Sequence, residues 1–372
     1  MLGVYVHLPF CPYICPYCDF AKWPMRATAA ARYLDALYAE LERETPVAAA
    51  TIYLGGGTPN AYGVPAIADL LARLRLRFPG AHEVSIELNP ELVREDDFER
   101  YRDAGITRLS IGVQSFDPGE IARLGRKHRP EQIAGVVAAA RAAGIASVSL
   151  DLMFAVPGQS IASWRRTLDA AIALNVDHIS AYGLTVEEGT PYAAWQAREP
   201  AAFAENALEA ELYATAIETL QDAGYEQYEI SNFARPGHRC VHNMNYWANG
   251  EYVGLGVGAA SYRRGVRSVH TRSLDEYVSA ALDGHPIPSD AERLEGLKRV
   301  GEAVMLALRT AQGVGLSEFK ERYGIDVMAD YAPVVTRFAR NGLLERVGDT
   351  VRLTQRGRFL ANDVCGAFVT FE

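Results

Sequence analysis

Apolar runs rich in β-branched residues alternate with amphipathic stretches over the first half of the chain. A short apolar run indicates a buried strand, and apolar residues with a 3.6-residue period indicate a helix that packs on it. The predicted strands are Val4–Leu8, Thr51–Leu54, Glu83–Leu88, Arg108–Val113, Ala146–Met153 and Asp177–Leu184. The predicted helices are about Thr28–Glu44, Val64–Phe78, Arg94–Ala104, Pro130–Ala143 and Ser160–Leu174. Such β-α repeats predict a parallel sheet with helices outside it.

A residue that could take part in binding or catalysis stands at or near the end of each predicted strand. These residues are Cys11, the run Gly55–Thr58, Glu87, Gln114, Asp151 and Tyr182. Taken singly, each is explained equally well as a residue that ends a strand. Six in succession are what a barrel-like sheet with one shared site at the carboxyl ends of its strands predicts.

The second half of the chain has a different pattern. A predicted helix at about Phe203–Ala223 is followed by a glycine- and aromatic-rich stretch, residues 224–261. From Ala291, three predicted helices and a hairpin, LLERVGDTVRLT, resemble a small winged helix. We therefore predict two domains, residues 1–285 and 291–372, joined by a linker at Pro286–Asp290. Arginines in the second domain are interpreted as a solvated surface.

Composition narrows the classes of function. The chain has 372 residues and a formal net charge of −9, whereas nucleic-acid binding normally requires a basic face. The N-terminus lacks the pattern of a signal peptide, and no stretch reaches the roughly 18 apolar residues of a membrane span. We expect a cytoplasmic protein that binds no nucleic acid and does not span a membrane. In that reducing compartment, five cysteines indicate metal or redox chemistry rather than disulfides.

Three of the five cysteines lie in one short segment, HLPFCPYICPYCDF. A structural zinc site needs a fourth ligand, and His7, the nearest candidate, is predicted to lie inside the first strand. Cys11, Cys15 and Cys18 fit an iron-sulfur cubane better, because three thiolates hold three irons and leave the fourth iron open. Three unrelated buried cysteines would leave the clustering unexplained.

These residues carry a family resemblance. The pattern CxxxCxxC with an aromatic residue before the last cysteine, followed after the second strand by LGGGTP, resembles the radical S-adenosylmethionine (SAM) superfamily. The resemblance implies a radical SAM partial (β/α)6 barrel, a [4Fe-4S] cluster and SAM, which chelates the open iron and yields a 5'-deoxyadenosyl radical. The three glycines would let backbone groups approach the methionine part of SAM.

Further motifs resemble one branch of the superfamily, which contains oxygen-independent coproporphyrinogen III oxidases and heme chaperones. They are SIELNP, SIGVQSFD, LGRKH and DLMFAVPGQ, and with the first two they span most of the first 260 residues. By position in these motifs, the resemblance implies SAM contacts at Tyr5, Tyr17, Gly56, Gly57, Thr58, Glu87, Gln114, Arg126 and Asp151. Gly183 and Ala260 occupy positions that lie near a second SAM in the oxidase.

The segment His242–Trp247 matches HNxxYW, a motif associated with heme binding in the chaperones. The resemblance implies that His242 ligates heme iron, that Asn243 orients the ring, and that Tyr246 and Trp247 pack on the porphyrin. The alternative is structural: the same residues are expected in an aromatic, asparagine-rich turn whose histidine lies in the core and is hydrogen bonded. Cys240 is an alternative ligand or an inert buried thiol, and Cys365 is predicted to lie in a core.

Besides the HNxxYW motif, the residue two places after the third cysteine separates the two kinds of relative. The oxidase carries a further cysteine two residues after the third, where this chain has Phe20. We therefore expect a heme chaperone that delivers heme to acceptor hemoproteins such as those of a respiratory chain. The oxidase is the alternative, whether the chain is an enzyme stays open, and a homodimer is compatible with the family.

Overall fold

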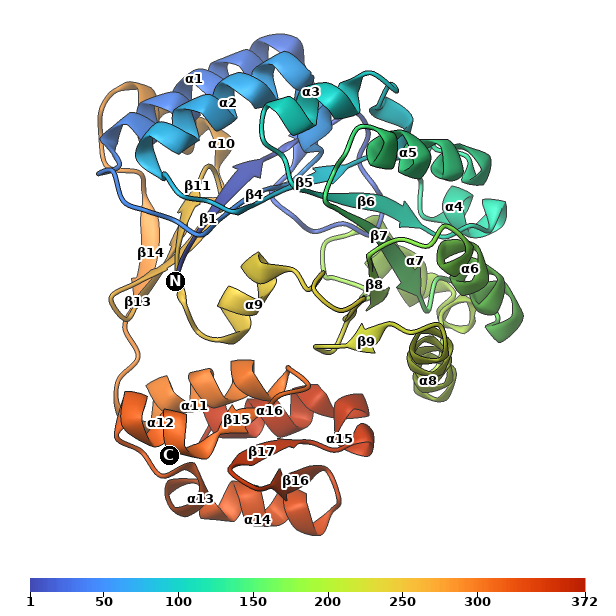
Figure 1. Cartoon of the computed structure of the whole chain (residues 1–372), viewed down its shortest axis with the longest axis vertical. Helices are drawn as coiled ribbons and strands as arrows, with labels where there is room; N and C mark the ends of the chain where they lie inside the picture. Colours follow the sequence, from blue (N-terminus) through green and yellow to red (C-terminus); the bar gives the residue numbers. More distant parts are fainter. Residues whose placement is uncertain (372) are drawn as a thin grey trace.

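The computed structural model describes residues 1–371 and has one large sheet with helices along its outer face, and a smaller unit below it (Figure 1). Six consecutive parallel strands form the centre of the sheet. They are β1 (Leu2–Leu8), β4 (Thr51–Gly56), β5 (Glu83–Leu88), β6 (Arg108–Gln114), β7 (Ser147–Phe154) and β8 (His178–Gly183). Each predicted strand is confirmed, with ends that differ by two residues at most.

The helices between these strands cover one face of the sheet because their apolar stripes pack against it. They are α1 (Ala27–Arg43), α2 (Val64–Arg77), α3 (Asp97–Asp103), α5 (Pro130–Ala142) and α6 (Ile161–Ala173). The short α4 (Pro118–Arg123) follows β6 and contributes no residue to this core. Gly105 and Gly144 follow α3 and α5 with φ of 90° and 81°, a left-handed conformation that ends a helix and that glycine adopts without strain. Within residues 1–371, no helix has the length and apolar character needed to cross a membrane.

The sheet continues on both sides of the six predicted strands, which the sequence pattern did not reveal. β11 (Glu251–Leu255) pairs in parallel with β1, and β12 (Ala260–Arg263), β13 (Val266–His270) and β14 (Ser289–Glu292) extend that edge with antiparallel pairs. β10 (Asn232–Ala234) and β9 (Glu226–Gln227) continue the edge beyond β8. The sheet has twelve strands and is not closed, so it forms a partial barrel.

β14 corrects the predicted linker. Residues 289–292 pair with β13 and belong to the large sheet, so residues 293–295 form the irregular connection to the smaller unit. The first helix of the smaller unit begins at Gly296 rather than Ala291, because the polar residues before it continue an edge strand.

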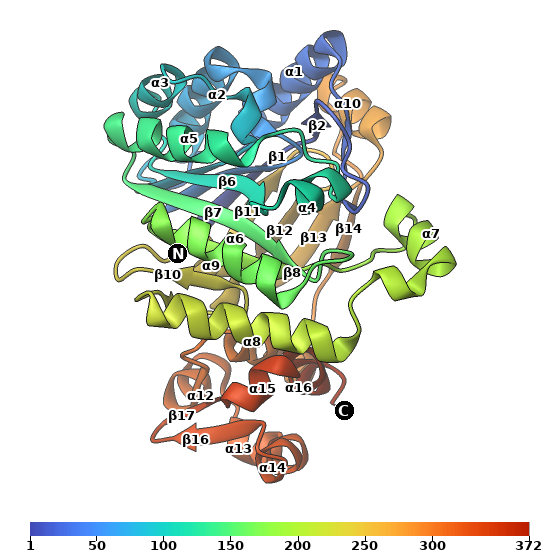
Figure 2. The ribbon, with the colours of Figure 1, turned by 90° about the vertical axis from the view of Figure 1, so that its right-hand side faces the viewer.

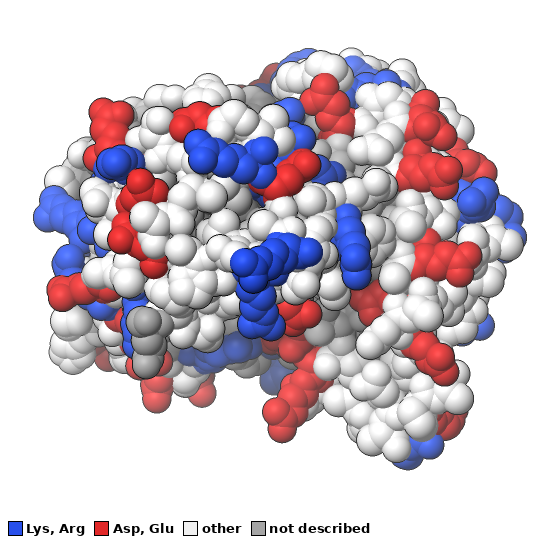
Figure 3. Space-filling model, turned by 90° about the horizontal axis from the view of Figure 1, so that it is seen from below, with Lys and Arg blue, Asp and Glu red and all other residues white. Residues whose placement is uncertain are grey.

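The smaller unit has a hydrophobic core of its own, with Cys365 buried in it as predicted. Its helices are α11 (Gly296–Leu308), α12 (Leu316–Tyr323), α13 (Val327–Asp330), α14 (Ala332–Arg340), α15 (Gln355–Phe359) and α16 (Ala361–Val369). They pack on a three-stranded sheet of β15 (Val314–Gly315), β17 (Thr350–Leu353) and β16 (Leu344–Val347), as expected for a winged-helix-like unit. Seen from below, acidic and basic side chains are interspersed over the molecule (Figure 3).

A short helix, α9 (Val241–Trp247), lies between the large sheet and the smaller unit, and α8 (Asn206–Asp222) lies above that unit (Figures 1 and 2). Two contacts join the smaller unit to the segment around α9. The guanidinium of Arg322 donates to the backbone oxygens of Ala248 and Asn249, both at 2.9 Å. The guanidinium of Arg309 lies over the ring of Trp247. The HNxxYW segment is therefore a connection between the two units.

Candidate functional site

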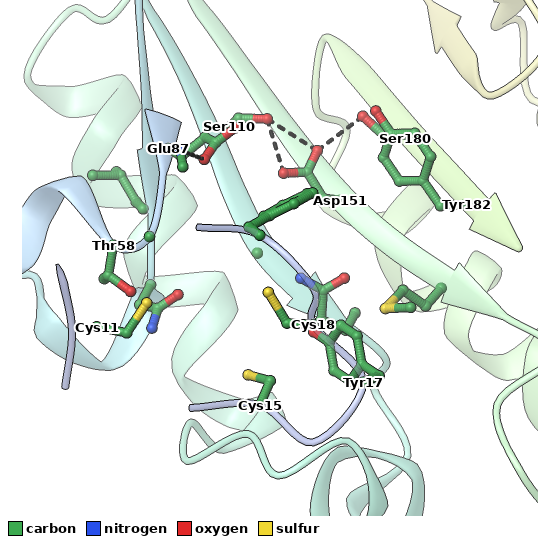
Figure 4. Close-up of a pocket in the computed structure, with 18 of the residues that line it drawn as sticks. Cys11, Cys15, Tyr17, Cys18, Thr58, Glu87, Ser110, Asp151, Ser180 and Tyr182 are labelled. Carbon is green, nitrogen blue, oxygen red and sulfur yellow. Dashed lines mark hydrogen bonds between the residues drawn. The ribbon is translucent and has the colours of Figure 1, made fainter. Parts of the chain in front are cut away.

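A cavity of about 400 Å³ lies at the carboxyl ends of the central strands. We call it the cysteine cavity because Cys11, Cys15 and Cys18 line it (Figure 4). Its walls include every predicted SAM contact except Tyr5, namely Tyr17, Gly56, Gly57, Thr58, Glu87, Gln114, Arg126 and Asp151. Residues drawn from five successive strands or the loops after them thus converge, as a parallel partial barrel requires.

Backbone hydrogen bonds fold the cysteine loop. A short strand, β2 (Phe10–Cys11), pairs with β3 (Trp23–Pro24), and the N–H of Met25 donates to the carbonyl of Cys11 at 2.7 Å. Within the loop, the N–H of Cys18 donates to the carbonyl of Cys15 at 3.3 Å. The two ends of the loop are therefore held together, and its three thiols flank one space (Figure 4).

All three thiols are free. Burial raises the pKa of the Cys11 thiol to about 11, and burial likewise raises that of Cys18. Within residues 1–371, no group of three or more His, Cys, Asp or Glu side chains converges on a single metal ion. A cluster distributes its thiolate ligands over several irons, so three separated thiols around one space fit a cluster better than a lone ion.

Gly56, which ends β4, and Gly57, which follows it, have a packing role that the sequence did not reveal. A Cβ on Gly56 would lie 2.4 Å from the ring of His7, and one on Gly57 would lie 2.6 Å from the carbonyl carbon of Pro9. Gly56 also has a φ of 109°. The glycines thus bring β4 against the segment that leads to Cys11, as well as forming part of the cavity wall.

Glu87 provides the buried carboxyl group of the cavity. Its Oε2 accepts the backbone N–H of Gly56, and its Oε1 accepts the hydroxyl of Tyr53, both at 3.0 Å. Burial, and then the charge of Asp151, raise the pKa of Glu87 to about 7. A cationic group bound beside Glu87 would favour its charged form, so this carboxyl group fits an ammonium ligand.

Two serines orient the carboxyl group of Asp151. Ser110 donates to it at 2.8 Å and Ser180 at 2.8 Å, and burial raises the pKa of the carboxyl group (Figure 4). Neither serine was among the site residues predicted from the sequence. The period of a strand would have found them, because Ser110 shares a strand face with Gln114, and Ser180 with Tyr182.

Arg126 supplies positive charge to the cavity. One of its guanidinium nitrogens donates to Asn89 Oδ1 at 2.8 Å and to the carbonyl of Gly112 at 2.7 Å. Its Nε is buried and has no partner within residues 1–371, which fits a carboxylate ligand. Nearby, Gln114 has a φ of 65°, the kind of strained backbone that recurs at binding sites.

Tyr5 lines a second cavity of about 570 Å³, which we call the side cavity. It lies between β12–β13, the loop after Cys18, α9 and α11, and it shares Asp19, Phe20, Gly56 and Glu87 with the cysteine cavity. Ala260 lines the side cavity whereas Gly183 lines the cysteine cavity, so the two positions associated with a second SAM are not brought together.

The four predicted heme contacts on α9 face different surroundings. His242 is 1% exposed and lines neither cavity. Asn243 lines the cysteine cavity and Tyr246 the side cavity, whereas Trp247 packs against Arg309 of the smaller unit. The structure thus does not gather these four side chains around one porphyrin-sized space.

His242 is fully hydrogen bonded. Its Nδ1 lies 2.7 Å from Thr51 Oγ1 and its Nε2 lies 2.7 Å from the hydroxyl oxygen of Tyr246. Burial lowers the pKa of the imidazole to about 3. Cys240, the alternative ligand, is buried with its thiol 3.6 Å from Glu83, and burial raises its pKa to about 12.

Phe20, the residue that distinguishes this chain from the oxidase pattern, is 60% exposed. It lines both cavities where they adjoin. A large exposed apolar side chain at the junction of two cavities is suited to contact a planar apolar ligand.

Comparisons with known proteins agree with this architecture. The family model "Radical SAM superfamily" matches residues 5–171, and "HemN C-terminal domain" matches residues 295–360. The solved structure of coproporphyrinogen III oxidase (HemN) from Escherichia coli, a radical SAM enzyme, is similar over the whole chain and 90% of its own, with a TM-score of 0.87 and 25% identity. The predicted fold class is confirmed.

Curated relatives narrow the assignment. Proteins named "Heme chaperone HemW" are 32% identical over 99% of this chain and 99% of theirs in Bacillus subtilis, and 33% identical over 99% and 98% in Escherichia coli. One from Mycobacterium tuberculosis is 38% identical over 97% and 93%. The chain therefore belongs to the radical SAM superfamily and, within it, to the HemW family.

Proposed function

We propose that the protein is a heme chaperone that binds a [4Fe-4S] cluster, SAM and heme and passes the heme to acceptor hemoproteins. The observation that carries this proposal is the pair of adjoining cavities. One is lined by three free thiols and by groups suited to a zwitterion, and the other is larger and opens beside the exposed ring of Phe20. The heme chaperone relatives in the HemW family support the same function.

The cysteine cavity would hold the cluster and SAM. Cys11, Cys15 and Cys18 would ligate the cluster, which supplies an open iron and one-electron chemistry when it is bound. The carboxyl group of Glu87 would bind the SAM ammonium and the Nε of Arg126 its carboxylate, because each lies in this wall with the matching charge. Asp151, oriented by its two serines, would accept a ribose hydroxyl.

The heme would be cargo rather than a resident cofactor. A chaperone needs a ligand space from which the porphyrin is released, and the side cavity is lined by the large unit and by Leu306 of the smaller unit. Acceptor hemoproteins, including those of a respiratory chain, are the proposed recipients.

The test is anaerobic reconstitution with iron and sulfide, followed by a ferric heme titration and a transfer assay on the same preparation. The expected result is a saturable heme absorbance band and the appearance of holoprotein when an apo-hemoprotein is added. Transfer must exceed that from free heme at equal concentration. Absence of the band, or a transfer rate equal to that of free heme, would rule the chaperone function out.

Oxygen-independent coproporphyrinogen III oxidase is the second candidate, because the solved structure of that enzyme is similar over the whole chain. The same preparation, supplied with SAM and an electron donor, is tested for decarboxylation of coproporphyrinogen III. We expect no protoporphyrinogen, because Phe20 stands where the oxidase pattern has a fourth cysteine. Protoporphyrinogen formation would make the oxidase the correct assignment.

A further inference from the structure

We propose that ferric heme binds in the side cavity with the phenol oxygen of Tyr246, rather than His242, as the ligand of its iron, and with Arg272 paired to a propionate. This inference rests on the proposed function and specifies its heme site. His242 becomes a positioning residue that holds Tyr246 from the protein side.

The surroundings of His242 argue against direct ligation. Both of its ring nitrogens are already in 2.7 Å hydrogen bonds, to Thr51 and Tyr246, and its side chain is buried against the ring of Tyr53 with 5.2 Å between centroids. To reach an iron, the imidazole would have to leave the core. That movement would also leave the fully buried hydroxyl of Thr51 without this partner, which costs free energy.

Tyr246 is the member of the motif that both lines the side cavity and carries an atom able to bind iron. Tyrosine oxygen is a known axial ligand of ferric heme iron in proteins. The Tyr246 ring is held in place by edge contacts with His242 and Tyr252, at 4.8 and 4.6 Å between centroids. The ring is therefore fixed at the wall of the side cavity.

The hydrogen bond between Tyr246 and His242 can stabilise a phenolate. With the Thr51 hydroxyl donating to Nδ1, the Nε2–H of neutral His242 donates to the Tyr246 oxygen. When that oxygen binds ferric iron, its O–H bond breaks, the proton passes to solvent, and no electron is transferred. His242 would thus stabilise the bound phenolate without touching the heme, as residues behind a metal ligand commonly do.

The walls of the side cavity match the rest of a heme. Its volume lies within the roughly 300–1,000 Å³ of typical ligand cavities, and Phe20, Val269 and Leu306 present apolar surface to it. Phe20 and Val269 are exposed although they are large apolar side chains. Such exposure is explained if a flat apolar ligand covers them.

Two arginines also line the side cavity, and only one of them is available to a ligand carboxylate. Arg267 is paired with Glu302 at 3.0 Å and donates to the Tyr252 hydroxyl. Arg272 is exposed and donates to the backbone oxygen of Asp19 at 2.6 Å, and no carboxylate within residues 1–371 pairs with it. The heme propionates supply such a carboxylate.

The experiment is a ferric heme titration of the reconstituted full-length chain, followed by absorption and electron paramagnetic resonance spectroscopy. The wild-type protein is compared with Tyr246→Phe, His242→Gln and Arg272→Gln, and with Tyr38→Phe as a control on α1 outside both cavities. Cluster content and thermal unfolding are measured for every variant, so that misfolding is recognised separately from loss of the ligand.

We expect a high-spin ferric spectrum with a phenolate-to-iron charge-transfer band in the wild-type protein and in Tyr38→Phe. Tyr246→Phe should lose the band. His242→Gln should keep it while heme affinity falls about 10–100-fold, the usual effect of removing a residue behind a metal ligand. Arg272→Gln should weaken heme binding but not binding of heme dimethyl ester, in which both propionates are esterified.

The inference is overturned if folded Tyr246→Phe keeps the wild-type spectrum, or if an imidazole-type spectrum is seen and disappears in His242→Gln. Equal effects of Arg272→Gln on heme and its dimethyl ester would overturn the propionate contact. If the wild-type protein binds no ferric heme, the proposed function itself fails. That outcome is distinct from heme binding through another ligand.

Discussion

Glu83 and His242 are joined by a hydrogen bond that attaches the start of α9 to β5: Oε1 of Glu83 accepts the backbone N–H of His242 at 2.8 Å. The other carboxylate oxygen accepts the N–H of Val241 at 2.9 Å. A buried carboxylate thus satisfies two N–H groups that have no partner inside the helix, and its charge suits the positive end of the helix.

This attachment predicts that Glu83→Ala destabilises the protein by about 1–3 kcal/mol, because buried donors lose their acceptor. Urea unfolding measures the loss. The control is Glu226→Gln, which removes an exposed pair with Arg239 and should change the free energy of unfolding by less than about 0.5 kcal/mol. Equal stability of Glu83→Ala and the wild-type protein would contradict the role of Glu83.

The close approach at Gly57 predicts that Gly57→Ala lowers cluster content after reconstitution. An added methyl group meets the Pro9 backbone, which must shift together with the loop that carries the cysteines. The matched control is Gly135→Ala in α5, where a Cβ meets nothing within 4 Å. Because alanine favours a helix more than glycine does, the free energy of unfolding of that variant should rise by about 0.5–1 kcal/mol. Iron and sulfide analysis and thermal unfolding report the two effects.

For the cluster, we predict that Cys15→Ser leaves the reconstituted protein without a [4Fe-4S] cluster. A serine oxygen is a poor replacement for a thiolate, and the two remaining cysteines hold too few irons. Cys365→Ala, in the core of the smaller unit, is the control and should retain full iron and sulfide content. Unchanged iron and sulfide in Cys15→Ser would eliminate the cluster assignment.

The unpartnered Nε of Arg126 predicts weaker SAM binding in Arg126→Lys. Lysine keeps the charge but lacks the planar fork, so a charge-assisted hydrogen bond of about 1.5–3 kcal/mol is lost and the dissociation constant rises about tenfold or more. The neighbouring Lys127 is exposed, and Lys127→Gln should bind SAM like the wild-type protein. Equilibrium dialysis at equal cluster content measures the SAM dissociation constants. Identical constants for Arg126→Lys and Lys127→Gln would refute the contact between Arg126 and the SAM carboxylate.

Buried Glu40, which lies outside both cavities, should make the stability of the protein depend on pH. Burial raises its pKa to about 7, although Tyr277 and the N–H of Gly256 donate to it. Between about pH 4.5 and 7 the folded state therefore binds more protons than the unfolded state, so the free energy of unfolding falls as pH rises through that window.

Glu40→Gln removes this titration while its amide oxygen keeps an acceptor for both donors. The free energy of unfolding of Glu40→Gln, relative to that of the wild-type protein, should rise by on the order of 2 kcal/mol as the pH is raised from 5 to 8. Exposed Glu42 on the same helix provides the control, since Glu42→Gln should show no such trend. Denaturant unfolding at pH 5 and pH 8 measures this change. If the free energies of unfolding of Glu40→Gln and the wild-type protein differ by the same amount at both pH values, the raised pKa is disproved.

Local sequence determined a large part of this protein. The six central strands are confirmed because period and β-branched content are local properties, and the cysteine triplet was visible because its three thiols are adjacent in the chain. Positions at strand ends also predicted which residues share the cysteine cavity, since parallel strands bring their carboxyl ends to one edge.

Only the tertiary structure decided the surroundings of the motif on α9. The letters HNMNYW are compatible with one ligand-binding surface, yet the helix directs His242 into the core, Tyr246 to the side cavity and Trp247 to the smaller unit. The partners responsible, including Thr51 and Arg309, are far away in the sequence. A residue's hydrogen-bond partners across such separations come from packing, which no local period encodes, so the structure alone distinguishes a buried histidine from one that faces a ligand.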